Sequence, residues 1–186
     1  MVYDDNVLLL DYPRSHGKSA EESSDGGQME LDTADLQLVD ALQRDAAQRL
    51  DDLARLVQMA PSSVHERLRR LERDGIIRRW SVDLNAVALG LGVLAYIGVS
   101  ATRPCRDLVA ELETILAIEE CHSVAGPLSL LLKVRVAATS DLLALTERVR
   151  QVPGIEGTET TIVLKTQIDR PMAIPAPPPH KRVRAR

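Results

Sequence analysis

The segment from Gln58 to Asp74, QMAPSSVHERLRRLERD, restricts the possible fold of this chain more than any other. Pro61 suits the first turn of a helix, where its missing N–H is not needed. Val64, Leu68 and Leu71 then recur at steps of four and three residues, which places one apolar stripe along that helix. Hydroxyl residues at its start, followed by arginines, suit a helix that enters a major groove and touches phosphates. A solvated amphipathic surface helix is the alternative for this segment alone.

Two shorter helices are predicted ahead of this segment. Asp32 or Thr33 can cap the first of them, and the second covers residues 50–57. Residues 58–60 then leave a three-residue turn before the Pro61 helix. Three helices with such a turn between the second and the third form a helix-turn-helix unit.

The segment after the third helix is predicted to complete this unit. Gly75 is expected to end the helix, as a C-terminal glycine does. Residues 76–82, IIRRWSV, predict a strand that would supply a wing. We therefore predict a winged helix-turn-helix DNA-binding domain over residues 29–84, followed by a hinge over residues 85–91.

Charge is unevenly distributed along the sequence. The formal net charge is −4, which by itself argues against a nucleic-acid partner. Residues 1–30, however, hold seven acidic residues against two basic ones, whereas residues 61–80 hold six arginines against three acidic residues. A local basic patch matters more for DNA binding than the charge of the whole chain. Double-stranded DNA is therefore the expected partner of the third helix.

Residues 92–170 change to a pattern of alternating strands and helices. Only 2% of the chain is aromatic, so the cores have to be built from Leu, Val, Ile and Ala. The predicted elements are a strand at 92–102, a helix at 106–116, strands at 119–125 and 128–137, a helix from a cap at Thr139 or Ser140 to about Val152, and a strand at 158–168. The order β-α-β-β-α-β is the ferredoxin-like arrangement. The fold class predicted for the chain is therefore α+β.

The two ends of the sequence are predicted to lie outside both domains. Residues 1–28 are rich in Ser, Gly and acidic residues, which is typical of a disordered extension. Residues 171–186 are rich in Pro and then basic, which indicates a flexible tail. The N-terminus lacks the apolar run of a signal peptide, and no window reaches membrane-spanning length. We expect a cytoplasmic protein with no membrane partner.

The sequence indicates neither a metal site nor a catalytic site. Cys105 and Cys121 are too few for a disulfide framework or a zinc site, so both are interpreted as small buried or half-buried residues in a reducing compartment. His122 follows Cys121 on a predicted strand, so their side chains point to opposite faces. The four histidines are scattered, and no phosphate loop, nucleophile elbow or carboxylate pair occurs. We expect no enzymatic activity, no metal and no cofactor.

Five strings within residues 31–170 carry a family resemblance: LDTADLQLVDALQRD, LARLVQMAPSSVHERLRRLERDGIIRRW, EECHSVAG, LLLKVRV and VPGIEGTET. They resemble the Lrp/AsnC, or feast/famine, family of bacterial regulators, and RLRRLERDGII is a specific match. The resemblance implies a C-terminal ligand-binding and oligomerisation domain (a RAM domain, here residues 92–170) that dimerises through its sheet. It also implies a tetramer of dimers, an amino-acid effector bound between dimers, and a nucleoid-associated protein of the bacterial cytoplasm.

The sequence departs from the family pattern in two regions. The family's usual glycine in the turn before the Pro61 helix is Gln58, and its usual capping serine is Ala60. Loss of a cap costs about 1 kcal/mol at a helix end. The family's acidic turn before the third strand is GPLS, residues 126–129, so two carboxylates that could face the effector's amino group are absent. We still expect a pocket at this turn, with an altered ligand preference.

The candidate DNA-contacting residues lie on the Pro61 helix and in the predicted wing. Those near the helix start are candidates for base edges, and the arginines opposite the apolar stripe are candidates for phosphates. Glu66 could accept from a cytosine amino group or pair with Arg69 or Arg70, and we favour the pairing. Arg67 flanks the core and could bind a wing carbonyl or an acid instead of DNA. The full set is Ser62, Ser63, His65, Glu66, Arg67, Arg69, Arg70, Arg73, Arg78 and Arg79.

The candidate effector site, placed by the resemblance, is the turn between the second and third strands of the ligand-binding domain. Gly126 lacks a side chain there, so the backbone can approach a ligand closely. Hydroxyl groups of the turn or of the last strand could bind the charged groups of an amino acid. An ordinary hairpin turn is the alternative. The full set is Ala125, Gly126, Pro127, Leu128, Ser129, Thr160 and Thr161.

These expectations combine into a transcriptional regulator that binds DNA sequence-specifically and responds to an amino acid bound between dimers. Two other functions stay open. One is an architectural, nucleoid-type DNA-binding protein without an effector response, which the altered turn at 126–129 keeps open. The other is an amino-acid-sensing regulatory subunit of a biosynthetic enzyme, since βαββαβ domains also serve in that role. DNA affinity unchanged by any amino acid would indicate the first, and absence of DNA binding at low salt the second.

Overall fold

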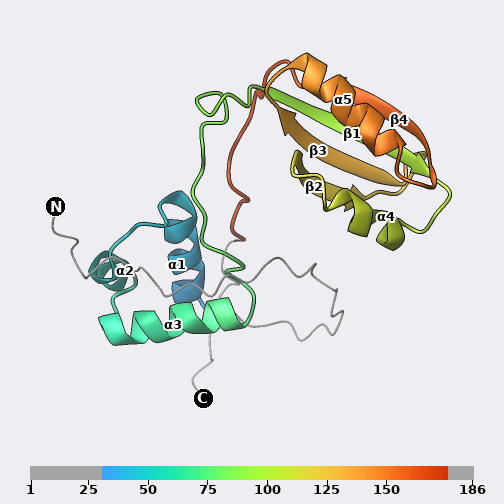
Figure 1. The fold of residues 1–186 in the computed structure, drawn as a ribbon. Coiled ribbons are helices and arrows are strands. Elements are labelled where there is room, and N and C mark those ends of the chain that lie inside the picture. Colours follow the sequence, from blue (N-terminus) through green and yellow to red (C-terminus); the bar gives the residue numbers. More distant parts are fainter. Residues whose placement is uncertain (1–30, 176–186) are drawn as a thin grey trace. The chain divides into compact units, whose positions relative to one another are not determined.

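A computed structural model of the chain describes residues 31–175. The predicted extension over residues 1–28 lies outside the described residues, and so does the predicted tail from residue 176 onward. The described residues divide into two compact units: 31–82 together with 170–175, and Asp83–Asp169. Among the described residues, the first unit holds three helices and the second holds the sheet with its two helices (Figure 1).

The helical unit consists of α1 (Thr33–Arg44), α2 (Leu50–Val57) and α3 (Pro61–Arg73) (Figure 1). Their apolar stripes meet in one core, in which Leu38 of α1 and Leu68 of α3 are almost completely buried. The three predicted helices are confirmed, and so is the short turn between the second and the third. This arrangement is a helix-turn-helix.

Helix α1 begins at a reciprocal capping box. The Asp35 N–H donates to Asp32 Oδ1 at 2.8 Å, and the Asp32 N–H donates to Asp35 Oδ2 at 3.3 Å. Two N–H groups that a helix start leaves open are satisfied in this way. Of the two predicted caps, Asp32 is confirmed, and Thr33 is the first helical residue.

The connection between α2 and α3 holds a residue in an unfavourable conformation. Gln58 has φ 55° and ψ 44°, in the left-handed region that favours glycine. Within residues 31–175 it is the one residue other than glycine with a positive φ. Ala60 then caps α3 without a side-chain hydrogen bond. Both departures from the family pattern in this turn therefore cost stability locally.

The substitution Gln58→Gly is expected to raise the free energy of unfolding of the helical unit by about 0.5–1 kcal/mol. Glycine removes a left-handed strain of about 1–2 kcal/mol, while its greater freedom in the unfolded chain offsets part of that gain. Urea unfolding followed by the fluorescence of Trp80 measures the effect, because the single tryptophan of the chain packs against the helical core. Gly75, with φ 75°, provides the matched control. Gly75→Ala should destabilise, and a destabilising Gln58→Gly would contradict the prediction.

Helix α3 ends as predicted, but no strand follows it. Gly75 has φ 75°, and its N–H donates to the Glu72 carbonyl at 3.0 Å. The predicted strand over residues 76–82 is wrong, because none of the described strands pairs with this segment. Ile77 and Trp80 pack against the helical core instead, and Trp80 Nε1 donates to Glu72 Oε1 at 2.5 Å. These contacts fold the segment back along α3.

The segment predicted as a hinge, residues 85–91, forms a hydrogen-bonded turn. The Asn85 side chain accepts from the Ala88 N–H at 3.1 Å. The Leu91 N–H donates to the Ala86 carbonyl at 2.8 Å. The boundary between the two units lies just before this turn, between Val82 and Asp83.

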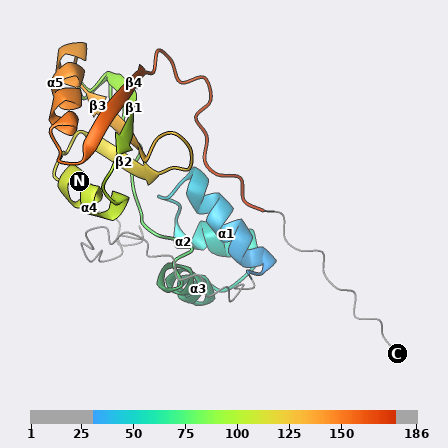
Figure 2. The same ribbon diagram turned by 90° about the vertical axis from the view of Figure 1, so that its right-hand side faces the viewer.

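The second unit is a four-stranded antiparallel sheet with two helices on one face (Figure 2). Its elements are β1 (Val93–Ala101), α4 (Cys105–Leu112), β2 (Ile118–Ser123), β3 (Leu130–Val136), α5 (Thr139–Arg150) and β4 (Ile155–Ile162). The strand order is β2-β3-β1-β4, with antiparallel pairing throughout. The predicted ferredoxin-like arrangement, and with it the α+β class, is confirmed.

Alternation along the strands assigns each residue to one of the two faces of the sheet. Ile97 of β1 pairs with Leu132 of β3, and both are fully buried in the core beneath the helices. The next pair, Tyr96 with Lys133, therefore faces the other side, the open face. Helices α4 and α5 cover the first face alone, so the open face has no covering layer within this unit.

Two boundaries in this unit differ from the sequence prediction by four residues or more. Helix α4 ends at Leu112 instead of residue 116, and Leu116 is 97% exposed, so it adds nothing to the buried stripe. Strand β4 ends at Ile162 instead of residue 168. Its last pair is Ile162 with Ala95, and the neighbouring strand β1 begins only two residues before Ala95, at Val93.

The start of α5 also differs from the prediction. Its N-cap is Ala138, so neither Thr139 nor Ser140 caps the helix. The Asp141 carboxylate accepts from the Ala138 N–H at 3.0 Å. The predicted hydroxyl cap is thus replaced by a carboxylate that reaches back from the first turn, where the helix dipole favours negative charge.

Candidate nucleic-acid interface

Helix α3 presents two different faces. Val64, Leu68 and Leu71 are buried in the helical core, which confirms the predicted apolar stripe. The exposed side chains on the opposite face are Ser62, Glu66, Arg69 and Arg73. The residues of this second set are four, three and four positions apart, so they form one stripe along the helix.

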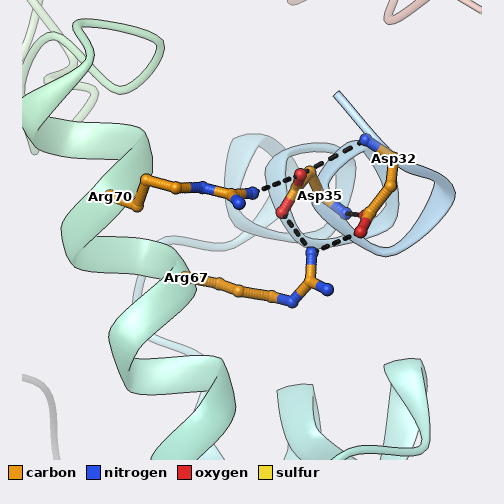
Figure 3. Close-up of polar contacts among 4 residues, drawn as sticks. All are labelled: Asp32, Asp35, Arg67 and Arg70. Carbon is orange, nitrogen blue, oxygen red and sulfur yellow. Dashed lines mark hydrogen bonds and ion pairs between the residues drawn. The ribbon is translucent and has the colours of Figure 1, made fainter. Parts of the chain in front are cut away.

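A buried acidic residue of α1 holds α3 in place (Figure 3). Asp35 is 1% exposed, and its two carboxylate oxygens accept from Arg67 Nη1 at 2.8 Å and Arg70 Nη2 at 2.5 Å. Arg67 Nη1 also donates to Asp32 Oδ2 at 2.6 Å. Figure 3 shows both arginines reaching from α3 to the start of α1. We call these four residues the clamp.

The clamp is electrostatically complementary. Burial acts to raise the pKa of Asp32, but the hydrogen bond from the Asp35 N–H and the contact with Arg67 outweigh it and lower this pKa below its ordinary value of 3.8. Hydrogen bonds to Asp32 and then Asp35 raise the pKa of Arg67. Because the pKa of Asp32 is lower in the folded than in the unfolded state, its carboxylate stabilises the fold at pH values above its unfolded pKa. This contribution is lost as the pH falls through the lower pKa of the folded state.

The clamp corrects the expected position of one arginine and decides between the alternatives for another. Arg70 is predicted opposite the apolar stripe and free to meet a phosphate, but its guanidinium binds Asp35. For Arg67 the predicted alternative of an acid is confirmed, because it binds Asp32 and Asp35 of the α1 start. Asp35 lies in the first turn of α1, and its role as a partner of α3 was not predicted. The two acids of the clamp are three residues apart, and so are its two arginines. This matching spacing is the sequence signal that could have revealed the contact.

Glu66 has no hydrogen-bond or ion-pair partner among residues 31–175, contrary to the favoured prediction that it pairs with Arg69 or Arg70. No described residue donates a hydrogen bond to its carboxylate or forms an ion pair with it. Arg70 is unavailable because it binds Asp35. Glu66 instead lines an open hollow of about 280 Å³, together with Met59, Ser63, Arg67 and Arg70.

The remaining candidates for DNA contact differ in exposure. Ser63 and His65 are half-buried, whereas Arg78 and Arg79 are exposed on the segment after α3. Arg73 is exposed and pairs with the neighbouring Asp74, from Nε to Oδ1 at 3.0 Å. Exposed pairs of this kind contribute about 0–1 kcal/mol. Arg73 can therefore exchange this partner for a phosphate at little cost.

The predicted effector turn, residues 125–129, lies between β2 and β3. Gly126 has φ 134°, a conformation that side-chain-bearing residues rarely adopt. The Ser129 hydroxyl lies 3.2 Å from the Ala101 N–H and accepts from it. Leu128 lies over Gly98, where an added Cβ would come within 2.6 Å of its Cδ1. Ser129 is thus engaged with the end of β1, and Ala125, Gly126 and Pro127 remain exposed or half-exposed at the turn.

The two threonines predicted at the effector site point to opposite faces of the sheet. Thr160 pairs with Ile97, on the helix-covered face, and its hydroxyl lies 3.4 Å from that of Thr146 on α5. Thr161 pairs with Tyr96, on the open face. The expectation that both hydroxyls serve one ligand is therefore wrong, because neighbouring residues of a strand alternate in direction.

Neither a membrane-spanning helix nor a metal cluster is present in the part of the chain that the structure describes. Over residues 31–175 no helix is long and apolar enough to cross a bilayer, and no group of three His, Cys, Asp or Glu could hold a metal. Cys105 and Cys121 are both half-buried against the sheet core. Burial raises the pKa of the Cys121 thiol, which keeps it in its unreactive protonated form.

Both units match families of known proteins. Residues 31–78 match the family described as winged helix-turn-helix DNA-binding, and residues 94–173 match the Lrp/AsnC ligand binding domain. The chain is 36% identical over 138 residues to the HTH-type transcriptional regulator LrpA of Mycobacterium tuberculosis, an alignment that covers 73% of this chain and 91% of that protein. The chain belongs to the Lrp/AsnC family. As a member of this family it is a transcriptional regulator with a DNA-binding and a ligand-binding domain, and not an enzyme.

Two further comparisons support the family assignment. The chain is 30% identical to the HTH-type transcriptional regulator FL11 of Pyrococcus abyssi, over 73% of this chain and 91% of that protein. It is also similar to the structure of the feast or famine regulatory protein of M. tuberculosis complexed with L-methionine, with a TM-score of 0.73 at 35% identity, over 78% of this chain and 99% of that one. Lrp/AsnC relatives thus occur in archaea as well as in bacteria, so family membership does not imply a bacterial source.

Proposed function

We propose that this Lrp/AsnC regulator binds specific DNA sequences and that an amino acid bound between its dimers alters its affinity for DNA. The observation that carries the proposal is α3. The clamp orients this helix, and its exposed stripe offers Ser62, Arg69 and Arg73 to a partner. A related protein complexed with L-methionine supports an amino acid as the class of effector.

The proposed mechanism uses two copies of α3. A dimer formed through the open sheet faces presents one α3 from each protomer to successive major-groove faces of a pseudo-palindromic site. Base edges are contacted near the helix start by Ser62, Ser63 and His65. Phosphates are contacted by Arg69, Arg73, Arg78 and Arg79. Four such dimers in a ring bend DNA and add phosphate contacts. An amino acid at the turn 125–129, with Thr161 of the open face, shifts the assembly equilibrium by binding one state more tightly.

A DNA titration with a panel of amino acids tests the proposal. The protein is titrated at fixed low salt against a pool of genomic DNA fragments from its own organism, with and without each amino acid. At least one amino acid should change the affinity by roughly 5- to 150-fold, the usual range for coupling between sites. Absence of binding at low salt would exclude the DNA-binding function and favour a regulatory subunit.

An architectural DNA-binding protein without an effector response is the second candidate. The observation that favours it is the turn itself, where Leu128 lies over Gly98 and the Ser129 hydroxyl binds the end of β1. Such a turn offers fewer free polar groups to a ligand than one with two carboxylates. DNA affinity that no amino acid changes would favour this second candidate.

The substitution Gly126→Thr is expected to abolish the amino-acid response while DNA binding at low salt is kept. A threonine cannot adopt φ 134° without strain, so the turn has to change its backbone path. DNA titrations with and without the effector measure the response, and light scattering measures assembly size in parallel. Gly92→Thr is the control, because Gly92 has open space around it and no positive φ. A Gly126→Thr variant that still responds fully would place the effector elsewhere.

A further inference from the structure

Glu66 occupies the middle of the exposed stripe of α3. Ser62 lies one turn before it, and Arg69 and Arg73 lie one and two turns after it. The buried stripe of Val64 and Leu68 faces the other way. Glu66 is therefore the one acidic residue of this stripe, which the proposed function turns toward DNA.

Within residues 31–175, no side chain forms a hydrogen bond or an ion pair with this carboxylate. Arg70, four residues along, is held by Asp35 through Nη2 at 2.5 Å. Arg67, the next residue, is held by Asp32 and Asp35. Arg69 is exposed and forms no ion pair with Glu66, and none of the other described residues does. The clamp thus engages Arg67 and Arg70, and the Glu66 carboxylate is left without an ion-pair partner among the described residues.

A carboxylate in this position is selective in its partners on DNA. It accepts hydrogen bonds only, so phosphate oxygens repel it. The hydrogen-bond donors in the major groove are the amino groups of cytosine and adenine. Adenine presents the acceptor N7 beside its amino group, whereas cytosine presents its amino group without an acceptor. Cytosine is therefore the base that satisfies Glu66 best.

We infer that Glu66 determines sequence specificity by accepting a hydrogen bond from the amino group of a cytosine in each half-site. This inference rests on the proposed DNA-binding function. Glu66 contributes selectivity through two opposite effects. It lowers affinity for DNA in general through repulsion, and it restores affinity where a cytosine lies opposite it.

The test compares the full-length protein with Glu66→Ala. Wild type selects its preferred duplexes from a random-sequence library, and both proteins are then titrated against a selected duplex and against one with the cytosine replaced by thymine, which presents an acceptor instead of a donor. Glu147→Ala, an exposed acid of α5 in the other unit, is the charge-matched control. Circular dichroism checks that the helix content of the variants is unchanged.

Wild type and Glu147→Ala should lose roughly 5- to 150-fold in affinity on replacement of the cytosine. Glu66→Ala should bind both duplexes equally and should bind random-sequence DNA more tightly than wild type. A Glu66→Ala variant that retains the cytosine preference would overturn the inference while the DNA-binding function stands, and so would a wild type that selects sites without such a cytosine. A wild type that binds no DNA at low salt would overturn the proposed function, and the inference with it.

Discussion

Replacement of Asp35 by alanine is expected to lower the free energy of unfolding of the helical unit by about 2–4 kcal/mol. Loss of one partner of a buried ion pair costs about 3–5 kcal/mol when the remaining charge stays buried. Here Arg67 is 24% exposed and Arg70 41% exposed, so water partly replaces the lost carboxylate and the cost is lower. The substitution also removes half of the capping box at the start of α1.

Trp80 fluorescence during urea unfolding measures this loss, because Trp80 packs against the helical core. Asp40→Ala is the matched control on the same helix. Asp40 pairs with Arg44 at 2.7 Å, but both side chains are well exposed, and such a pair contributes about 0.5 kcal/mol or less. Equal losses for Asp35→Ala and Asp40→Ala would show that the clamp does not stabilise the unit.

Replacement of Arg69 by alanine is expected to weaken DNA binding at all sequences alike. A phosphate contact releases counterions, so its loss should reduce the slope of log K against log salt by about 0.9 per protomer. Combined replacement of Arg69 and Arg73 should reduce it by about twice that amount. DNA titrations over a series of salt concentrations, on specific and random sequences, measure the slope.

Arg70→Ala separates the two roles that arginines have on α3. Because Arg70 is bound to Asp35, this substitution should lower the free energy of unfolding and leave the salt slope unchanged. If the salt slope falls for Arg70→Ala but not for Arg69→Ala, α3 approaches DNA with the side that carries Arg70 and not with the exposed stripe. The clamp would then open on binding.

Local patterns in the sequence determined most of the secondary structure. Spacings of three and four residues marked the apolar stripe of α3, and these residues are buried. Asp32 was recognisable as a cap because its hydrogen bond spans only three residues. The β-α-β-β-α-β order was readable for the same reason, since each helix or strand carries its own periodicity. The strings that resemble the Lrp/AsnC family lie on these elements, and the family assignment is confirmed.

Only the tertiary structure decided which arginines of α3 are free. Spacing places Arg70 beside the exposed stripe, but its partner Asp35 lies 35 residues earlier and on another helix. The strand predicted at 76–82 needed a pairing partner, and its own side chains packed against α3 instead. Alternation along the predicted strand already separates Thr160 from Thr161, but only the pairing with β1 shows that Thr161 lies on the open face. A sequence pattern states which side of an element is apolar, whereas contacts between elements depend on how those sides pack together.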